Sequence, residues 1–132
     1  MTTENNFRNL TAYKKAFALA MEIFQVSKKF PPEERYSLTD QVRRSSRSVC
    51  ASIGEAYRKR QYPAHFASKS SDADAENSET RVWLDIAKAC KYITDEVWSD
   101  LEDKAAEVGK LLNHMIENPE KYQTRRMKES KN

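Results

Sequence analysis

The chain has 132 residues, of which 33% are charged, and its net charge is +3. This length suits one domain with one core, and the presence of only two glycines argues against an all-β fold, so we expect helices. The N-terminus has no signal-peptide pattern, and no stretch approaches the roughly 18 apolar residues of a membrane span. We therefore expect a cytoplasmic protein that does not bind membranes.

Prolines and capping residues divide the chain into four segments with helical apolar periodicity. The four prolines, Pro31, Pro32, Pro63 and Pro119, lie at the breaks between them. Thr11 and Thr94 are expected N-caps, and Ser37-Leu-Thr-Asp40 matches a capping box. The pattern predicts helices over about 11–29, 38–60, 63–93 and 95–117. Short connections between them favour an all-α, antiparallel up-down-up-down four-helix bundle over residues 1–118. Residues 119–132 lack periodicity and predict a mobile basic tail.

The first predicted helix carries more apolar surface than one bundle seam needs. A heptad seam runs from Ala12 to Phe30, and a second stripe of Tyr13, Phe17 and Phe24 lies about 100° around the helix. Soluble monomers rarely expose such a patch, so the sequence predicts self-association with this second stripe as the oligomer interface.

The predicted helix 38–60 has two faces of opposite character. Its apolar stripe includes Val42, Val49 and Ile53, whereas basic side chains crowd the other side and the end of the helix: Arg43, Arg44, Arg47, Arg58, Lys59 and Arg60. Guanidinium groups fit phosphates, so one interpretation is a nucleic-acid surface. A second is a solvated or ion-paired face, with Asp40 pairing with Arg44 and Glu55 with Lys59.

A third interpretation makes these arginines structural. The following helix contains an acidic group of Asp72, Asp74, Glu76 and Glu79, which could face them within or between subunits. Glu79 borders the apolar half of its helix and would need an arginine partner there, with Arg44 or Arg43 as the candidates.

An enzyme is not expected. His65 and His114 are far apart in sequence, neither has a metal-ligand spacing, and no glycine-rich phosphate loop is present. Cys50 and Cys90 lie inside helical patterns and are expected to be free, buried and inert thiols. The sequence predicts no catalytic residue, no metal and no cofactor.

The polar positions of the chain resemble those of a known family. The segments that carry the resemblance are Phe7-Arg-Asn-Leu10, Gln41-Val-Arg-Arg-Ser-Ser-Arg-Ser-Val49, Arg58-Lys-Arg60 and Glu79-Thr-Arg-Val-Trp-Leu-Asp85, with Phe30-Pro31, Glu34 and Tyr36 between them. This pattern is similar to small bacterial four-helix-bundle proteins named after intervening sequences of 23S rRNA genes, also labelled S23 ribosomal protein. The chain departs from the family at Ser52, Gly54 and Lys91, where asparagine, alanine and glycine are usual.

The resemblance implies a homopentameric ring and no enzymatic activity. A related branch, the accessory proteins of diversity-generating retroelements, binds a reverse transcriptase and nucleic acid through a positively charged surface. We therefore expect an oligomeric protein that binds RNA or DNA through the basic face. The alternative is a scaffold or accessory factor for a protein partner such as a reverse transcriptase, without direct nucleic-acid contact.

Overall fold

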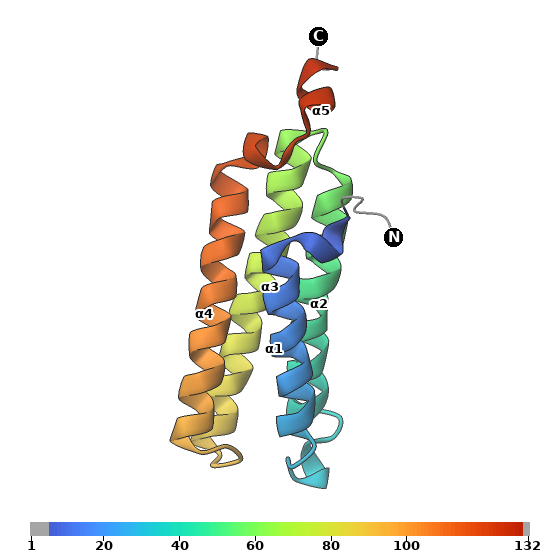
Figure 1. Ribbon diagram of the computed structural model, residues 1–132. Helices are drawn as coiled ribbons and strands as arrows, with labels where there is room; N and C mark the ends of the chain where they lie inside the picture. Colours follow the sequence, from blue (N-terminus) through green and yellow to red (C-terminus); the bar gives the residue numbers. More distant parts are fainter. Residues whose placement is uncertain (1–5, 131–132) are drawn as a thin grey trace, which may run out of the picture.

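The computed structural model describes residues 6–130, which form a bundle of four long helices with a short fifth helix at one end (Figure 1). The helices are α1 (Thr11–Ser27), α2 (Leu38–Arg58), α3 (Pro63–Ala89), α4 (Asp95–Glu117) and α5 (Arg125–Glu129), with 3-10 turns η1 (Phe7–Asn9), η2 (Pro32–Glu34) and η3 (Pro119–Tyr122). Residues 6–130 contain no strand, so the predicted all-α fold is confirmed.

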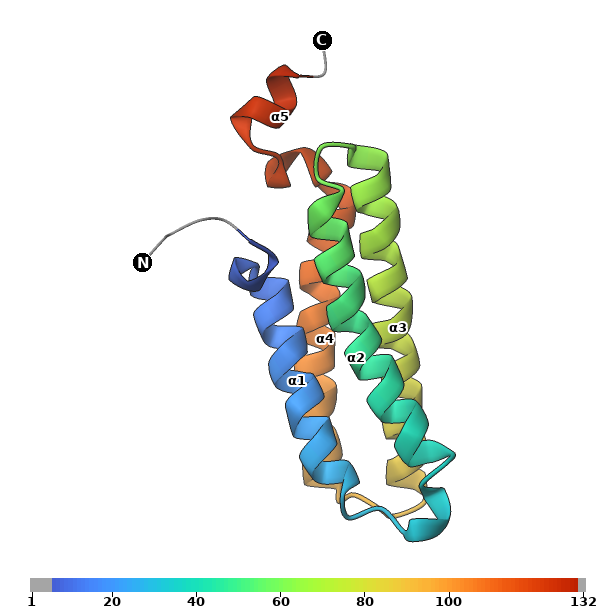
Figure 2. The ribbon, with the colours of Figure 1, turned by 90° about the vertical axis from the view of Figure 1, so that its right-hand side faces the viewer.

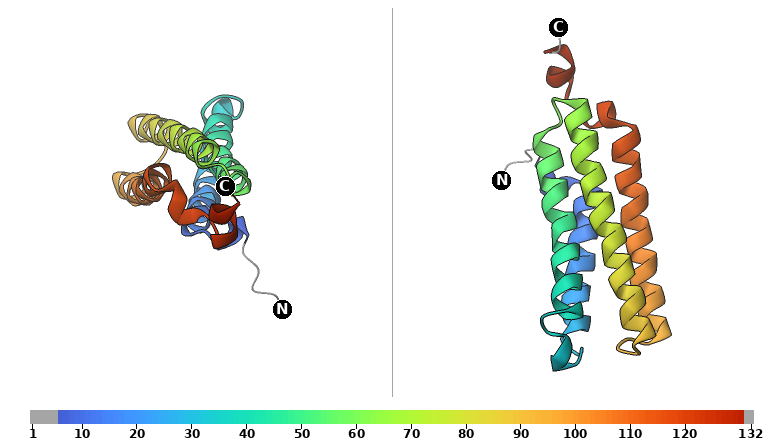
Figure 3. Two further views of the ribbon diagram at one scale, coloured as in Figure 1. Left: turned by 90° about the horizontal axis from the view of Figure 1, so that it is seen from above. Right: turned by 180° about the vertical axis from the view of Figure 1, so that it is seen from behind.

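Successive long helices run in opposite directions, and each packs beside its neighbour in the chain (Figure 2). The contacts join α1 to α2, α2 to α3, α3 to α4, and α4 back to α1. Helices α1 and α3 therefore lie at opposite corners of the bundle, as the view along its axis shows (Figure 3).

Small polar residues occupy the centre where α2, α3 and α4 meet. Thr80 lies with its hydroxyl 2.9 Å from the Glu76 carbonyl oxygen and 2.8 Å from the Ser45 hydroxyl. Asn77 donates from Nδ2 to the Ala105 carbonyl oxygen at 2.9 Å. These groups are buried, and their hydrogen bonds offset part of the loss of water, although Asn77 Oδ1 has no hydrogen-bond partner among the described residues.

Two of the expected N-caps differ from the prediction. Thr11 is the first residue of α1, and Leu10 precedes it without a side-chain cap. Ser37 precedes α2, but its hydroxyl caps no backbone N–H, so the predicted capping box is wrong. The Glu34 carboxylate instead accepts from Leu38 N at 3.3 Å, because η2 turns the chain back toward the helix start. At α4 the Thr94 hydroxyl accepts from Val97 N at 3.1 Å, as predicted.

Helix α3 ends at Ala89, four residues before the predicted end. Lys91 has a φ of 64°, in the left-handed region. Its N–H donates to the Lys88 carbonyl, and the Tyr92 N–H donates to the Ala87 carbonyl, each at 2.9 Å. This pair of bonds is a Schellman motif, which closes a helix at a residue that is usually glycine.

Residues directly after α4 pack against the end of the bundle, although the sequence predicts a mobile tail over 119–132; residues 131–132 of that tail lie outside the described part of the chain. Tyr122 packs its ring 5.2 Å from that of Phe66, and its hydroxyl lies 2.7 Å from His114 Nδ1. Gln123 is buried and donates to the Gln61 carbonyl at 3.2 Å. These contacts cover the end of the bundle at the α2–α3 connection, and α5 follows beyond them (Figure 1).

Candidate functional site

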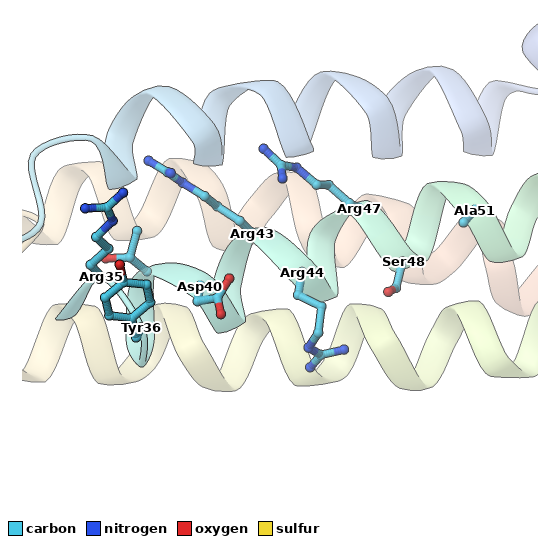
Figure 4. A pocket seen from close by; sticks show the side chains of 9 residues that line it. Arg35, Tyr36, Asp40, Arg43, Arg44, Arg47, Ser48 and Ala51 are labelled. Atoms are coloured by element: carbon cyan, nitrogen blue, oxygen red, sulfur yellow. The ribbon is translucent and has the colours of Figure 1, made fainter.

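A shallow groove runs along the outward face of the first half of α2 and the turn before it (Figure 4). Its basic side chains outnumber its acidic ones by four arginines to a single aspartate. The lining residues are Arg35, Tyr36, Thr39, Asp40, Arg43, Arg44, Arg47, Ser48 and Ala51. The small side chains of Ser48 and Ala51 leave the far end of this arginine groove open to a partner.

Arg43 and Arg47 lean from α2 toward α1 (Figure 4). Their guanidinium carbons lie 4.8 and 5.7 Å from the centre of the Phe24 ring, and Arg43 Nε donates to the Ser27 hydroxyl at 2.7 Å. Neither arginine forms an ion pair within residues 6–130. The aromatic ring thus holds two uncompensated cations next to each other, one helical turn apart.

Arg44 points the other way, toward α3 (Figure 4). Its guanidinium pairs with Glu79, lies 3.4 Å from the Glu76 carboxylate, and donates from Nε to the Gln41 side-chain oxygen at 2.9 Å. Glu79 also accepts from Trp83 Nε1 at 2.9 Å. Arg44 therefore links α2 to α3, in line with the structural interpretation for this one arginine.

The two short-range ion pairs expected on α2 are not formed in the described part of the chain. Asp40 makes no salt bridge with Arg44, whose side chain is drawn to α3. Glu55 pairs with Lys69 of α3 at 2.9 Å, and not with Lys59. The neighbouring helix competes successfully for both partners because α2 and α3 pack closely along their length.

The three basic residues at the end of α2 do not extend the arginine groove. Arg58 is exposed and lies about 16 Å along the helix from Arg47, beyond Ala51 and Gly54. Lys59 is exposed at the helix end. Arg60 stacks 3.6 Å from the centre of the Tyr57 ring and donates to the carbonyls of Tyr57 and Tyr122. Arg60 thus anchors the segment after α4.

The sequence prediction missed two residues of the groove, Arg35 and Tyr36. Tyr36 is 82% exposed, and the Arg35 guanidinium carbon lies 5.3 Å from the centre of its ring. Two adjacent residues in a connecting turn carry no periodic signal. The fold brings both residues to the end of the groove, beside the arginines of α2.

Glu34 fixes the turn that presents Tyr36. Its carboxylate accepts from Ser37 Oγ at 2.7 Å, from Tyr92 Oη at 2.8 Å and from Leu38 N. These hydrogen bonds, led by that of Ser37, lower the pKa of Glu34. The bond to Glu34 also raises the pKa of Tyr92 to about 12.

The predicted oligomer stripe on α1 is divided in the structure. Tyr13 is half-buried and packs against the rings of Phe7 and Phe17, at centroid distances of 5.0 and 5.9 Å. Phe24 is half-buried against Arg43 and Arg47. Phe17 is 47% exposed and is the member of the stripe most open to solvent.

Both cysteines are free, but Cys50 is half-buried and Cys90 is exposed, so the prediction that both are buried is wrong. Residues 6–130 contain no group of three or more histidine, cysteine, aspartate or glutamate side chains that could hold a metal ion. Over the same residues, no helix combines the length and apolar character needed to cross a membrane.

The fold and the groove define a small helical-bundle protein with a basic surface. The chain belongs to the 23S rRNA-intervening sequence protein family, whose sequence model matches residues 8–114. It is similar to the crystal structure of a protein of unknown function from the S23 ribosomal protein family of Bacteroides thetaiotaomicron. The two are 30% identical with a TM-score of 0.73, over 80% of this chain and 95% of that chain. No curated protein matches.

Proposed function

We propose that this protein is a non-enzymatic nucleic-acid-binding protein whose arginine groove contacts phosphates of the sugar-phosphate backbone. The observation that carries the proposal is the set of arginines without acidic partners. Arg35, Arg43 and Arg47 line one groove, and none of them forms an ion pair within the described residues. An ion-paired scaffold face would show the pairing that Arg44 shows.

The groove suits phosphate for a second reason. The stacking of Arg43 and Arg47 on Phe24 restricts their long side chains before any partner arrives, so less conformational entropy is lost on binding. In Arg43 only Nε donates to a protein acceptor in the described structure, which leaves the terminal N–H groups for a ligand.

The test compares Arg43→Gln/Arg47→Gln with a charge-matched control, Lys110→Gln/Lys121→Gln, whose lysines are exposed and lie outside the groove. Binding to RNA and DNA oligonucleotides is measured by fluorescence anisotropy over a range of salt concentrations. Phosphate contacts give a log-log salt slope of about −0.7 per phosphate on single strands. The arginine variant should flatten the slope by about 1.4 for each groove engaged, and the control should not.

An unchanged affinity and slope in the arginine variant would remove the groove as a nucleic-acid site. The alternative function, capture of an acidic protein partner by the same groove, would then take its place. Circular dichroism of both variants checks that the helices are retained.

We also propose that the chain assembles into the ring-shaped homopentamer that the family resemblance implies. Two exposed apolar patches support self-association. Phe17 and Met21 on α1 are 47% and 40% exposed, and Val82 and Ile86 on α3 are 52% and 40% exposed. Because α1 and α3 lie at opposite corners, the patches face different directions, as a closed ring of head-to-tail contacts requires.

Light scattering at micromolar concentration tests the assembly. The intact chain should scatter as five copies, and Phe17→Ser or Ile86→Ser alone should shift it toward monomer, since each contact needs both patches. A monomeric intact chain would refute the proposal.

A further inference from the structure

We infer that the arginine groove takes a single strand, RNA or DNA, and stacks one unpaired base on Tyr36. This inference rests on the proposed function and names the class of nucleic acid that the groove accepts. Its basis is the position of an almost fully exposed aromatic ring at one end of a row of arginines.

Tyr36 has no role in the fold that would account for its chemistry. Its side chain is 82% exposed, whereas the rings of Phe30 and Phe66 are buried and Tyr92 packs against the core. A polar side chain would serve equally well at such an exposed position, so packing in the core does not explain why the residue is aromatic. A flat π-face in open solvent is the surface on which nucleobases stack.

The turn that carries Tyr36 is held in place although the ring itself is exposed. Glu34, two residues earlier, binds Ser37, Leu38 and Tyr92, and so ties the turn to the start of α2 and to the segment after α3. The Arg35 guanidinium also lies against the Tyr36 ring. A platform that is already positioned loses little entropy when a base stacks on it.

The arginines continue from this platform along the helix. Arg43 and Arg47 are separated by four residues, which is about 6 Å along an α-helix. Adjacent phosphates of an extended strand have a similar spacing, so one strand can place a base on Tyr36 and its following phosphates on the two arginines. Figure 4 shows this order, with Arg35 and Tyr36 at one end of the groove and Arg47 further along α2.

A duplex cannot use this arrangement fully. Its bases are stacked on one another inside the helix, so their faces are closed to Tyr36 except at the ends. Duplex binding would therefore draw on the arginines alone. The geometry predicts tighter binding of a single strand than of a duplex with the same sequence.

The experiment uses oligonucleotides of about ten nucleotides, within the site sizes of small single-strand-binding folds. Each is prepared as RNA and as DNA, single-stranded and as a blunt duplex, with 2-aminopurine near the middle to report stacking by its fluorescence. A matched abasic strand carries the same phosphates without bases. The full-length protein is compared with Tyr36→Ala and Tyr36→Phe, and Arg43→Gln/Arg47→Gln serves as the phosphate variant.

Loss of one stacked base corresponds to about 5- to 150-fold weaker binding. Tyr36→Ala should show that loss on the single strand, Tyr36→Phe should bind like the unaltered protein, and the abasic strand should be insensitive to both changes. The control is Tyr62→Ala, which removes another exposed tyrosine at the opposite end of α2, outside the groove. It should change nothing.

The outcomes separate the inference from the function beneath it. If Tyr36→Ala binds single strands normally, or if the duplex binds as tightly as the single strand, the inference is overturned while the arginine dependence still supports the proposed function. If no oligonucleotide binds, or if the arginine variant binds normally, the proposed function falls and the inference falls with it. The RNA and DNA series show which of the two sugars the groove prefers.

Discussion

Replacing Lys91 by glycine should stabilise the protein. Lys91 closes α3 with a φ of 64°, where a side chain costs about 1–2 kcal/mol relative to the right-handed region. Glycine removes that strain but loses more chain entropy on folding, by about 0.5–1 kcal/mol. The net gain is about 0.7 kcal/mol, the difference between the middle values of the two ranges. The Schellman bonds at this helix end need only backbone atoms, so they are unaffected by the replacement.

Thermal unfolding followed by circular dichroism measures this gain. With about 2.1 cal/mol/K of unfolding entropy per residue, a 132-residue chain should rise in Tm by about 3–4 °C for each 1 kcal/mol. The protein concentration must be matched, because self-association shifts Tm by mass action. The control is Lys110→Gly, inside α4 and exposed, which should lower stability by about 1 kcal/mol. A fall in Tm for Lys91→Gly would refute the argument.

Three further substitutions test single contacts within the fold. Gly54→Ala should raise the free energy of unfolding by about 1 kcal/mol in a denaturant titration, since the added Cβ would lie an ordinary 3.8 Å from Phe7 Cδ1; a loss of stability would mean that the site is overpacked. The folded state lowers the pKa of Glu34, so the contribution of its carboxylate to stability is complete above pH 4.5 and is lost as the pH falls through the pKa of the folded state. The difference in unfolding free energy between the unaltered protein and Glu34→Gln should therefore disappear in acid. Folding raises the pKa of Tyr92 from 10 to about 12, so the contribution of its hydroxyl to stability is complete below pH 10 and is lost as the pH rises toward 12. Tyr92→Phe should abolish this loss of stability in alkali. An unchanged dependence of stability on alkaline pH in the variant would contradict the role of the hydroxyl.

The helices could be predicted from the sequence because their signals are local. Apolar spacing and prolines placed the four long helices within a few residues of their ends, except at α3. There the sequence has Lys91 where glycine would have signalled the end, so the periodicity of the helix appeared to continue. The predicted N-cap of α2 was wrong for a related reason. Both Ser37 and Glu34 can accept a hydrogen bond from the first N–H groups of the helix, and the path of η2 brings Glu34 to that position.

The candidate site could be predicted only as a set of residue types. The helical periodicity grouped Arg43, Arg44 and Arg47 on one side of α2, but the structure separates them by their neighbours. Arg43 and Arg47 lie toward α1 and its Phe24, and Arg44 lies toward α3 and its Glu79. The sequence pattern of one helix does not tell which helices pack on either side of it. Those neighbours decide which arginines are ion-paired and which have no acidic partner.

Because Arg44 is paired with α3, fewer arginines of one groove remain to hold a nucleic-acid strand. One groove offers two fixed arginines and one exposed ring, which is a small surface for a flexible strand. In the proposed ring each subunit would repeat the groove, and a strand already held at one groove would meet the next at a high effective concentration. The salt slope would then grow with the number of grooves engaged, by about 1.4 for each pair of single-strand phosphate contacts. A slope that stays at the value for one groove while the oligonucleotide is lengthened would show that the subunits bind independently.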